Sequence, residues 1–310
     1  MKNRALLFPV LCFLLMVACS QEKEPVRAIY HWKTTYNPTQ YELDWLRDHH
    51  VTRLYLHLFD VDVHETETAA PIATTRFLQV LPDGMEIVPV VYITNEAMDK
   101  MYWESEAIGR KIVERVLKMA ECKGFEVKEL QVDCDWTERT KDEYYRFCHY
   151  LQEMLHERGI RLSSTVRLHQ IEPRLDSLEV DNKTLMLYNT GNLRSPKTRN
   201  SILDYDDVAP YLSRLTTGRL QDMTLVWPVF GWGVAFKDGG QFSHLVNSAE
   251  LGRDSDGLVV REEWGEMEQM RHLWKEMPER GGERVTILYH LDSLNLSKYS
   301  YDEIEEIYSR

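Results

Sequence analysis

The sequence has fewer cationic than acidic residues, and nothing after its first eighteen residues resembles a long membrane segment. Its 37 lysines and arginines stand against 50 aspartates and glutamates, for a formal net charge of −13. Nucleic-acid binding requires clustered cations on a surface, so this balance argues against a nucleic-acid partner. A spanning helix requires about 20 consecutive apolar residues, and the body of the chain has no such run.

Cysteine is also scarce. Five are present, of which Cys12 and Cys19 lie near the start of the chain. The other three, Cys122, Cys134 and Cys148, cannot all pair with one another and do not have the spacing of a zinc site. Because Cys134 and Cys148 lie in apolar patterns, we expect buried free thiols rather than a disulfide framework.

The first residues have the pattern of an export signal. A basic start (Lys2, Arg4) precedes an apolar run over 5–18 that is too short to span a bilayer. The run ends in Met-Val-Ala before Cys19, which resembles the lipobox of bacterial lipoproteins. We expect 1–18 to be a lipoprotein signal peptide, Cys19 to be lipidated, and 19–26 to be a tether.

This resemblance implies a chain attached by its lipid to the outer membrane, on the periplasmic face or at the cell surface. The alternative is an ordinary secretory signal with a chance cysteine. That alternative would prefer an Ala-x-Ala cleavage site, which is absent here.

Residues 27–310 alternate between short apolar or β-branched runs and segments of helical periodicity, which is typical of repeated βα units. The predicted strands are Ala28–Trp32, Arg53–Phe59, Glu86–Ile93, Leu130–Trp136, Leu162–Leu168, Thr184–Asn189, Met223–Phe230 and Val285–Leu291. The predicted helices are Thr39–His49, Glu104–Cys122, Lys141–Arg158, Tyr205–Leu215, Glu262–Glu276 and Tyr301–Tyr308. Gly124 and Gly159 mark helix ends, and Thr140 with Glu143 predicts a capping box.

Eight strands with crossovers predict an α/β protein, a single-domain (β/α)₈ TIM barrel. The alternative is an open doubly wound sheet. Such a sheet usually has fewer strands, and the sequence has no glycine-rich phosphate motif after its first strand.

Polar and aromatic residues gather where the predicted strands end, which is where barrel enzymes carry their active sites. The substrate-binding candidates are Trp32, His57, Trp136, Arg167, His169, Tyr188, Asn189, Trp227, Trp232, Tyr289, His290 and Asp292. Other polar or aromatic residues at strand ends are His31, Lys33, Asp60, Tyr92, Asn95, Gln170 and Phe230.

The fourth predicted strand carries two acids. Alternation places Gln131, Asp133 and Asp135 on one face, and this face points into the barrel because the apolar face packs under the helices. Two neighbouring carboxylates repel each other, which raises the pKa of one and makes it a proton donor near neutral pH. We expect Asp133 and Asp135 to be catalytic, with Asp135 as the acid. The alternative is that they pair with Arg167 in a buried network.

The segment Gln-Val-Asp-Cys-Asp-Trp on this strand resembles the Asp-x-Asp-x-Glu motif of glycoside hydrolase family 18, whose last Glu protonates the glycosidic oxygen. More broadly, the body resembles glycosidase-like barrels of uncharacterised bacterial lipoproteins. Asp133 and Asp135 match the two aspartates of the motif. Thr137 stands in the place of the Glu, and Glu138 is one residue out of phase, which turns a side chain to the opposite face of a strand.

Aromatic residues independently favour a sugar ligand, because pyranose rings stack on such side chains. Five aromatic residues are predicted at one rim: Trp32, Trp136, Trp227, Trp232 and Tyr289. Each of them alone is more often a core residue. The glycine-rich segment 230–240 is expected to be a mobile binding loop, or else a folded turn on the rim.

These features favour a glycoside hydrolase that acts on an envelope or extracellular carbohydrate and needs no cofactor or metal. Its partners are then a carbohydrate and, through Cys19, a membrane. The first alternative is a non-catalytic glycan-binding surface lipoprotein with a degenerate glycosidase barrel. The second is a metal-dependent deacetylase or phosphodiesterase, which requires several histidines and aspartates to converge.

Overall fold

The computed structural model describes residues 25–63, 68–102, 104–251, 257–278 and 284–310. Eight parallel strands form a closed ring, because β1 pairs with both β14 and β3. In chain order these strands are β1 (Val26–His31), β3 (Arg53–Val63), β6 (Glu86–Ile93), β7 (Glu129–Asp133), β8 (Arg161–Arg167), β9 (Asn182–Met186), β10 (Met223–Pro228) and β14 (Val285–Tyr289). The closed ring confirms the predicted (β/α)₈ barrel, and the open-sheet alternative is wrong. The predicted signal peptide, Cys19 and most of the tether lie outside the described residues.

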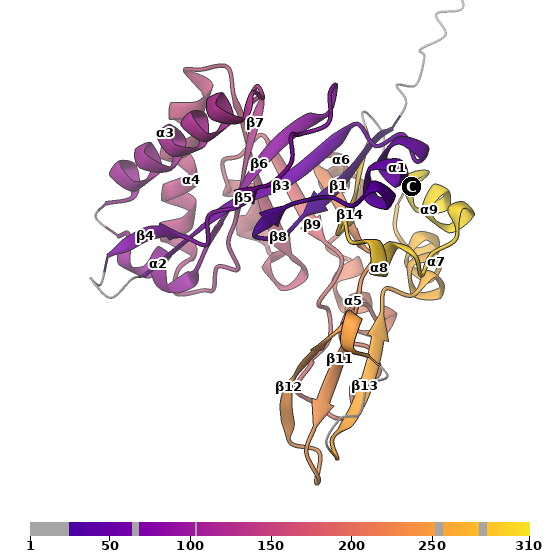
Figure 1. Ribbon diagram of the computed structural model, residues 1–310. Coiled ribbons are helices and arrows are strands. Elements are labelled where there is room, and N and C mark those ends of the chain that lie inside the picture. Colours follow the sequence, from indigo (N-terminus) through magenta and orange to yellow (C-terminus); the bar gives the residue numbers. More distant parts are fainter. Residues whose placement is uncertain (1–24, 64–67, 103, 252–256, 279–283) are drawn as a thin grey trace, which may run out of the picture.

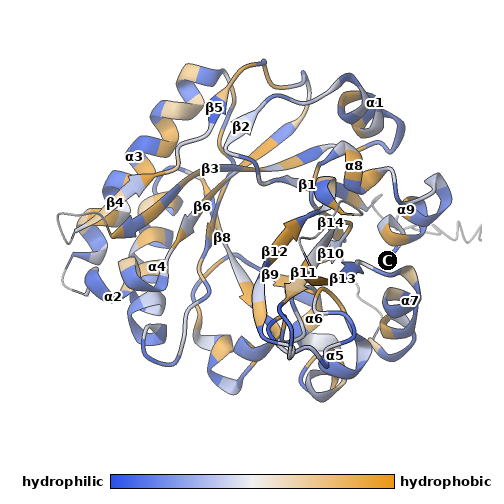
Figure 2. Cartoon of the chain, turned by 60° about the horizontal axis from the view of Figure 1, so that its bottom comes forward, coloured by the Kyte–Doolittle hydropathy of each residue, from blue (hydrophilic) through white to orange (hydrophobic). Residues whose placement is uncertain are grey.

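Helices surround the ring (Figure 2). They are α1 (Gln40–Asp48), α2 (Asn95–Lys100), α3 (Ser105–Lys123), α4 (Lys141–His156), α5 (Tyr205–Leu212), α6 (Thr217–Gln221), α7 (Met267–Glu276), α8 (Ser293–Leu296) and α9 (Tyr301–Tyr308). Apolar strand residues such as Leu130 and Val132 are fully buried, as expected for parallel strands that are covered by helices. No helix within the described ranges is both long and apolar enough to cross a membrane.

The smaller elements lie at the ends of the barrel strands. A short β4 (Ala69–Ile72) runs antiparallel to the end of β3, and β2 (Thr35–Tyr36) pairs with β5 (Arg76–Phe77). Three 3₁₀ turns, η1 (Leu168–Gln170), η2 (Pro173–Ser177) and η3 (Ser248–Glu250), complete the order. The short strands and η1 build up the carboxyl-terminal end of the barrel, whereas η3 belongs to the segment inserted between β10 and α7.

Two predicted helix ends at glycines are present, and one predicted capping box is absent. Gly124, directly after α3, and Gly159, three residues beyond the end of α4, have φ angles of 75° and 69°, the left-handed geometry that glycine allows. The capping box predicted at Thr140 is absent, since its side chain makes no cap hydrogen bond. The Glu143 side chain instead accepts a hydrogen bond from the Ser105 hydroxyl, which ties α4 to α3.

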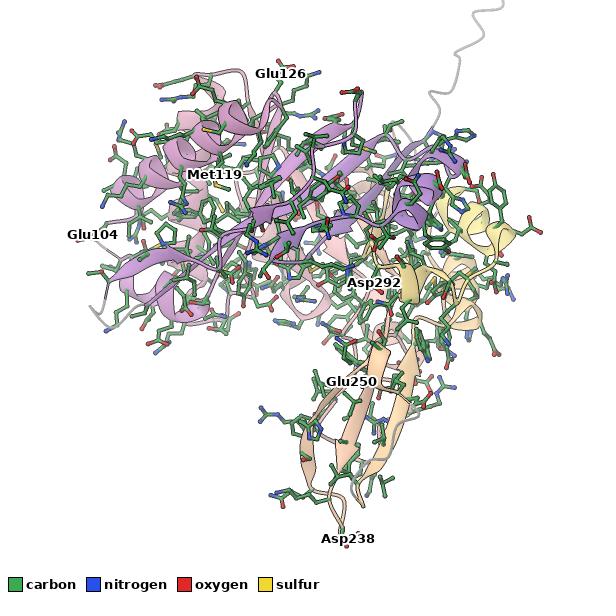
Figure 3. All side chains as sticks on the ribbon, viewed as in Figure 1. Glu104, Met119, Glu126, Asp238, Glu250 and Asp292 are labelled. Carbon is green, nitrogen blue, oxygen red and sulfur yellow. The ribbon has the colours of Figure 1, made fainter. Side chains whose placement is uncertain are left out.

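A three-stranded antiparallel sheet interrupts the βα pattern between β10 and α7. It consists of β11 (Gly231–Phe236), β12 (Phe242–Asn247) and β13 (Val259–Trp264), and extends away from the barrel (Figure 1). Asp238 lies at its far tip (Figure 3). Two predictions are corrected here: most of segment 230–240 is a paired strand rather than a mobile loop, and the helix expected from Glu262 begins at Met267.

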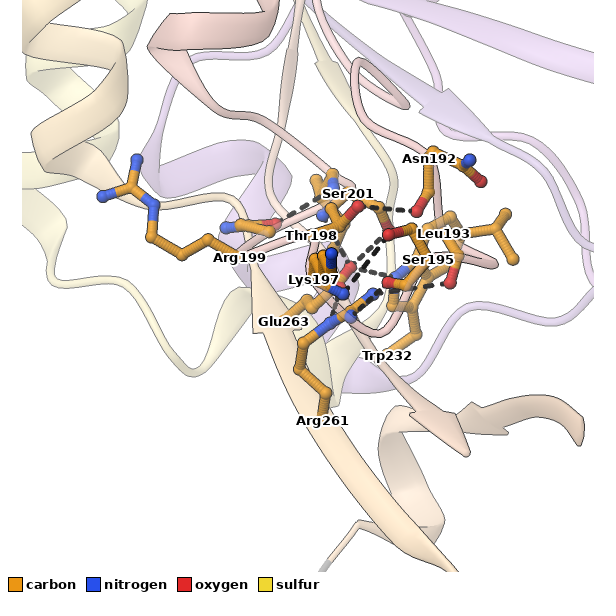
Figure 4. A network of polar contacts seen from close by, with 12 residues as sticks. Asn192, Leu193, Ser195, Lys197, Thr198, Arg199, Ser201, Trp232, Arg261 and Glu263 are labelled. Carbon is orange, nitrogen blue, oxygen red and sulfur yellow. Dashed lines mark hydrogen bonds and ion pairs between the residues drawn. The ribbon is translucent and has the colours of Figure 1, made fainter. Parts of the chain in front are cut away.

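A buried carboxylate joins this sheet to the loop that follows β9. The Glu263 side chain accepts hydrogen bonds from the Ser201 backbone N–H at 2.9 Å, the Trp232 indole N–H at 2.9 Å and the Arg261 Nε at 2.5 Å (Figure 4). Arg261 also donates to the Ser195 carbonyl at 2.9 Å. Because a buried carboxylate is stable only when its oxygens are satisfied, this network fixes the base of the sheet.

The three cysteines of the described chain are all free thiols. Cys134 and Cys148 are buried, and Cys122 is exposed. The prediction of buried free cysteines is confirmed for the two that lie in apolar patterns.

Candidate active site

Two adjacent cavities open at the carboxyl-terminal ends of the barrel strands, with volumes of about 310 and 270 Å³. Both are lined by Asp135, Arg167, Tyr188 and Asn189. The larger is also lined by Trp32, Thr34, His57, Asp60, Tyr92, Asp133 and Tyr289, and the smaller by Leu168, His169, Thr190 and Tyr211. The structure therefore brings together both predicted catalytic acids and seven of the twelve predicted binding residues.

A layer of hydrogen-bonded polar side chains lies inside the barrel, on the inward face of β7. The Tyr30 hydroxyl donates a hydrogen bond to Gln131 Oε1, and Gln131 Nε2 donates to the Thr184 hydroxyl at 3.1 Å. Gln131 and Asp133 thus point into the barrel, as strand alternation predicted. Since these partners satisfy the amide, Gln131 is a rigid support rather than a group offered to a ligand.

Asp133 is almost completely buried, with 4% of its surface exposed. It accepts a hydrogen bond of 2.6 Å from the Thr165 hydroxyl. Burial, together with the negative charge of Asp135, raises the pKa of Asp133 to about 6. This carboxyl can therefore hold a proton in weakly acidic solution.

Asp135 lies nearer the opening, with 41% of its side chain exposed. Arg167 donates to its two oxygens from Nε at 2.6 Å and from Nη2 at 3.3 Å. The same guanidinium lies 5.4 Å above the Tyr188 ring. The alternative of an ion pair with Arg167 is thus realised for Asp135, and the raised pKa belongs to Asp133 rather than to the residue predicted as the acid.

Thr137, a loop residue without a carboxylate, stands where the family 18 motif has its Glu. The Thr137 backbone N–H donates to the Thr140 hydroxyl at 3.0 Å. The neighbouring Glu138 is 80% exposed and pairs with Lys141 at 2.8 Å. Neither residue lines the two cavities described above.

Tyrosine hydroxyls line the wall of the larger cavity. Burial raises the pKa of Tyr188 and Tyr289 above the ordinary tyrosine value, and burial with the charge of Asp135 raises the pKa of Tyr92 to about 12. All three hydroxyls therefore keep their protons at neutral pH and can donate hydrogen bonds. The rings of Tyr188 and Tyr289 stack at 4.8 Å.

Asn189 and His169 complete the wall. Asn189 has a φ of 55°, a left-handed conformation that asparagine tolerates better than most residues. Burial lowers the pKa of His169, so that its imidazole is neutral at neutral pH.

Two predicted rim tryptophans do not reach the cavities. Trp136 is buried, in edge contact with Tyr145 at 5.7 Å between ring centres, and Trp227 is buried against Trp274 of α7 at 5.6 Å. Their rings pack between the barrel and its helices. This corrects the prediction that both belong to an aromatic rim.

Three further candidates do not line either cavity. Trp232 donates to Glu263 at the base of the inserted sheet. Asp292 caps α8 and pairs with Lys33 at 2.9 Å. His290 is largely buried, which lowers its pKa to about 4, and it does not line either cavity.

Several cavity residues were absent from the predicted set: Thr34, Asp60, Tyr92, Leu168, Thr190 and Tyr211. Asp60 and Tyr92 were recognisable, because both lie at predicted strand ends. Thr190 lies in the loop after β9, where periodicity carries no information about direction, and Tyr211 lies on α5, far along the chain from any strand end. Among the residues that the structure describes, no group of three His, Cys, Asp or Glu side chains is arranged to hold a metal ion.

No family model and no curated protein matches the sequence. Solved structures do match its fold. The spore cortex-lytic enzyme SleL of Bacillus cereus has a TM-score of 0.55 at 14% identity, over 92% of this chain and 75% of SleL. The Group IV chitinase of Ostrinia furnacalis has a TM-score of 0.58 at 12% identity, over 92% and 99% of the two chains, and has also been solved in complex with allosamidin.

A third match is the family 18 glycoside hydrolase ChiB, a chitinase from the chitin utilization locus of Flavobacterium johnsoniae. Its TM-score is 0.56 at 13% identity, over 93% of this chain and 94% of ChiB. The second catalytic domain of the Ostrinia furnacalis Group II chitinase, with a TM-score of 0.53, has been solved with a penta-N-acetyl chitooligosaccharide. The chain therefore has the barrel fold of the family 18 chitinases and SleL, at a distant level of sequence similarity.

Proposed function

We propose that this chain is a glycoside hydrolase that acts on a carbohydrate outside the cytoplasm. The observation that carries the proposal is a pair of cavity-lining carboxyls, Asp133 at the end of β7 and Asp135 two residues after it. Asp133 has a raised pKa, whereas Asp135 is paired as a carboxylate with Arg167. Glycosidic hydrolysis requires carboxyl groups in different protonation states around one sugar.

The contacts of Asp135 favour a role in charge stabilisation. Cleavage of a glycosidic bond develops positive charge at the anomeric carbon, and a fixed carboxylate stabilises that charge. Arg167 holds Asp135 in place through two hydrogen bonds. Donor hydroxyls of Tyr188 and Tyr289 can meanwhile orient oxygen atoms of the sugar.

The fold neighbours suggest which sugar to test first. Three of the four neighbours named above are chitinases, and one of them is solved with a penta-N-acetyl chitooligosaccharide. We therefore propose an N-acetylated aminosugar polymer as the substrate class. A neutral wall of tyrosine, tryptophan and asparagine side chains is compatible with such a substrate.

The test is hydrolysis of a panel of glycans and aryl glycosides by the purified chain. We expect turnover that falls at least about 100-fold in Asp135→Asn, since the variant keeps the shape but loses the charge. Asp142→Asn is the matched control, because Asp142 pairs with Arg174 on the exposed surface. No turnover on any substrate, together with saturable glycan binding, contradicts the proposal.

Trp32 gives a separate prediction about binding. Its ring lines the larger cavity and lies 5.1 Å from the His57 ring. Loss of one stacking aromatic typically costs about 1–2 kcal/mol, so Trp32→Ala should weaken glycan affinity roughly 10-fold. Calorimetric titration measures this change. Trp274→Ala, on α7, should leave the affinity unchanged, and equal affinities in wild type and Trp32→Ala contradict the assignment.

A non-catalytic glycan-binding lipoprotein is the second candidate. Thr137 in place of the motif's Glu, with Glu138 turned out to Lys141, is the observation that favours it. The same panel separates the two functions, because a binding protein retains affinity without turnover.

We also propose that the chain acts while anchored by a lipid on Cys19, at the outer membrane. The support is the apolar run and the lipobox-like residues before Cys19. Cys19→Ala should abolish labelling by a radioactive fatty acid and shift the protein from the membrane to the soluble fraction. Labelling that survives this substitution contradicts the proposed anchor.

A further inference from the structure

A groove on the outside of the barrel concentrates positive charge on an otherwise acidic chain. Its volume is about 520 Å³, and it lies between β5 and the second half of α3. Phe77 and Met119, both half-buried, are its larger apolar residues. The cations that line this cationic groove are Arg76, Arg115, Lys118 and Lys123. No described Asp or Glu lines it, although the whole chain has a net charge of −13.

The four cations make no ion pair with the residues that the structure describes. Arg115 donates from Nη2 to the Thr74 hydroxyl at 2.8 Å, and its guanidinium lies 5.0 Å over the Phe59 ring. Lys123 Nζ lies 4.9 Å over the Phe77 ring. Hydroxyls and rings orient a cation without cancelling its charge. The groove therefore offers its positive charge to an anion from outside the chain.

Two exposed apolar side chains stand beside the cationic groove. Leu78 and Val80 follow β5 directly, with 54% and 89% of their surfaces exposed. Single apolar residues are common on protein surfaces, but here two of them adjoin four unpaired cations. Apolar side chains next to cations are typical of surfaces that enter the headgroup layer of an anionic membrane.

The connection after α3 lies at the end of the barrel where β1 begins. The strands β1, β3, β6 and β7 pair in parallel, so that Val26 and Glu129, their first and last starting residues, lie at the same end. Helix α3 ends at Lys123, shortly before β7 starts. Glu126 in this connection and Asp238 at the tip of the inserted sheet lie at opposite ends of the molecule (Figure 3). The end of α3 thus lies away from the end that carries the two cavities.

We propose that the cationic groove docks the barrel on the phosphate groups of an anionic lipid bilayer, with Leu78 and Val80 in the headgroup layer. The docked barrel carries its two cavities on the side away from the bilayer, where a glycan can reach them. This docking goes beyond hydrolysis and does not depend on a lipid at Cys19. The other anionic occupant is a second copy of this acidic chain, which the test below distinguishes.

Vesicle binding tests the docking surface. Residues 25–310 hold all eight strands of the closed barrel with their core, so this part is used without the first residues. We expect it to sediment with vesicles of phosphatidylglycerol and phosphatidylcholine in equal parts, and not with phosphatidylcholine alone. Lys118→Gln with Lys123→Gln should lower the partition coefficient about 30-fold, because each cation near an anionic surface strengthens binding about 5-fold. Leu78→Ser with Val80→Ser should lower it several-fold.

The matched control is Arg110→Gln with Arg139→Gln. It also removes two exposed cations, but these pair with Glu106 and Asp99. The control should bind like the unsubstituted chain, and thermal unfolding should be alike in all variants. Binding that is equal on both kinds of vesicle, or equal losses in the two pairs of cation variants, overturns the docking surface.

Sedimentation velocity supplies the second readout. We expect the chain to stay monomeric at the concentrations at which it binds vesicles. A dimer that is lost in Lys118→Gln with Lys123→Gln, in a chain that ignores the vesicles, places a second copy in the cationic groove and overturns the proposal. Glycan hydrolysis is measured without vesicles, so failure of the docking surface leaves the hydrolase proposal in place.

Discussion

Replacing Arg167 with methionine is expected to lower the free energy of unfolding by about 2 kcal/mol at pH 7.5. Removing one partner of a buried ion pair leaves the other charge uncompensated, which costs about 3–5 kcal/mol when burial is complete. The cost is smaller here because 41% of the Asp135 side chain is exposed. Urea denaturation measures the change. Arg167 also offsets the charge of the nearby Asp133, whose pKa lies near 6, so at pH 4, where Asp133 is protonated, the loss should shrink.

Arg174→Met is the matched control for this variant. Arg174 also pairs with an aspartate, Asp142 at 2.7 Å, but both side chains are exposed. Such pairs contribute at most about 1 kcal/mol, so the control should unfold almost like wild type. Similar losses of unfolding free energy in the two variants would contradict the claim that burial strengthens the Arg167–Asp135 pair.

Asp133→Asn is expected to stabilise the protein at pH 8 and to reduce catalysis. The pKa of Asp133 lies near 6 in the folded chain, against 3.8 ordinarily, so the folded state binds a proton more tightly than the unfolded state. Stability is then lost as the pH rises from about 4 to 6, and the loss is constant above that range. Asparagine carries no charge and retains an oxygen for the Thr165 hydroxyl.

The expected gain at pH 8 is on the order of 3 kcal/mol, because the pKa of Asp133 is raised from 3.8 to about 6 and each unit corresponds to about 1.4 kcal/mol. At pH 3 the gain should vanish, because both states of the wild type are then protonated. Thermal unfolding across pH measures it, and turnover should fall about 100-fold in the same variant. A gain that does not change with pH contradicts the raised pKa. A stabilised variant with full turnover contradicts the catalytic use of this carboxyl.

Periodicity predicted the eight barrel strands well, because every strand carries at least two apolar residues that are buried, even the mostly polar β8 and β9. It also predicted the direction of Asp133, since β7 is regular. Asp60 was recognisable from its place at a strand end, but alternation could not predict that it lines the same cavity as His57, because the register of β3 with β6 shifts at Leu58 in a β-bulge. Bulges arise from the register with a neighbouring strand, which a single sequence does not contain.

The aromatic residues show a different limit. Trp32 and Trp227 are both tryptophans near strand ends. Trp32 lines the larger cavity, whereas Trp227 lies in the core against Trp274. A large aromatic ring packs favourably either in the core or beside a cavity, so the residue type alone does not distinguish the two environments. The inserted sheet was missed because the segment around Gly231 has the glycine content of a loop. A Cβ at Gly231 would lie only 2.3 Å from the Trp264 ring, so its glycine serves close strand contact instead.

The measurement that tests the central claim most directly is mass spectrometry of N-acetylated chitooligosaccharides incubated with the chain in ¹⁸O-labelled water. Hydrolysis predicts shorter oligomers that carry one ¹⁸O at each new reducing end, formed by wild type and nearly absent with Asp135→Asn. Intact oligomers after incubation with wild type, under conditions in which they bind, would contradict the claim that this barrel hydrolyses a chitin-like glycan.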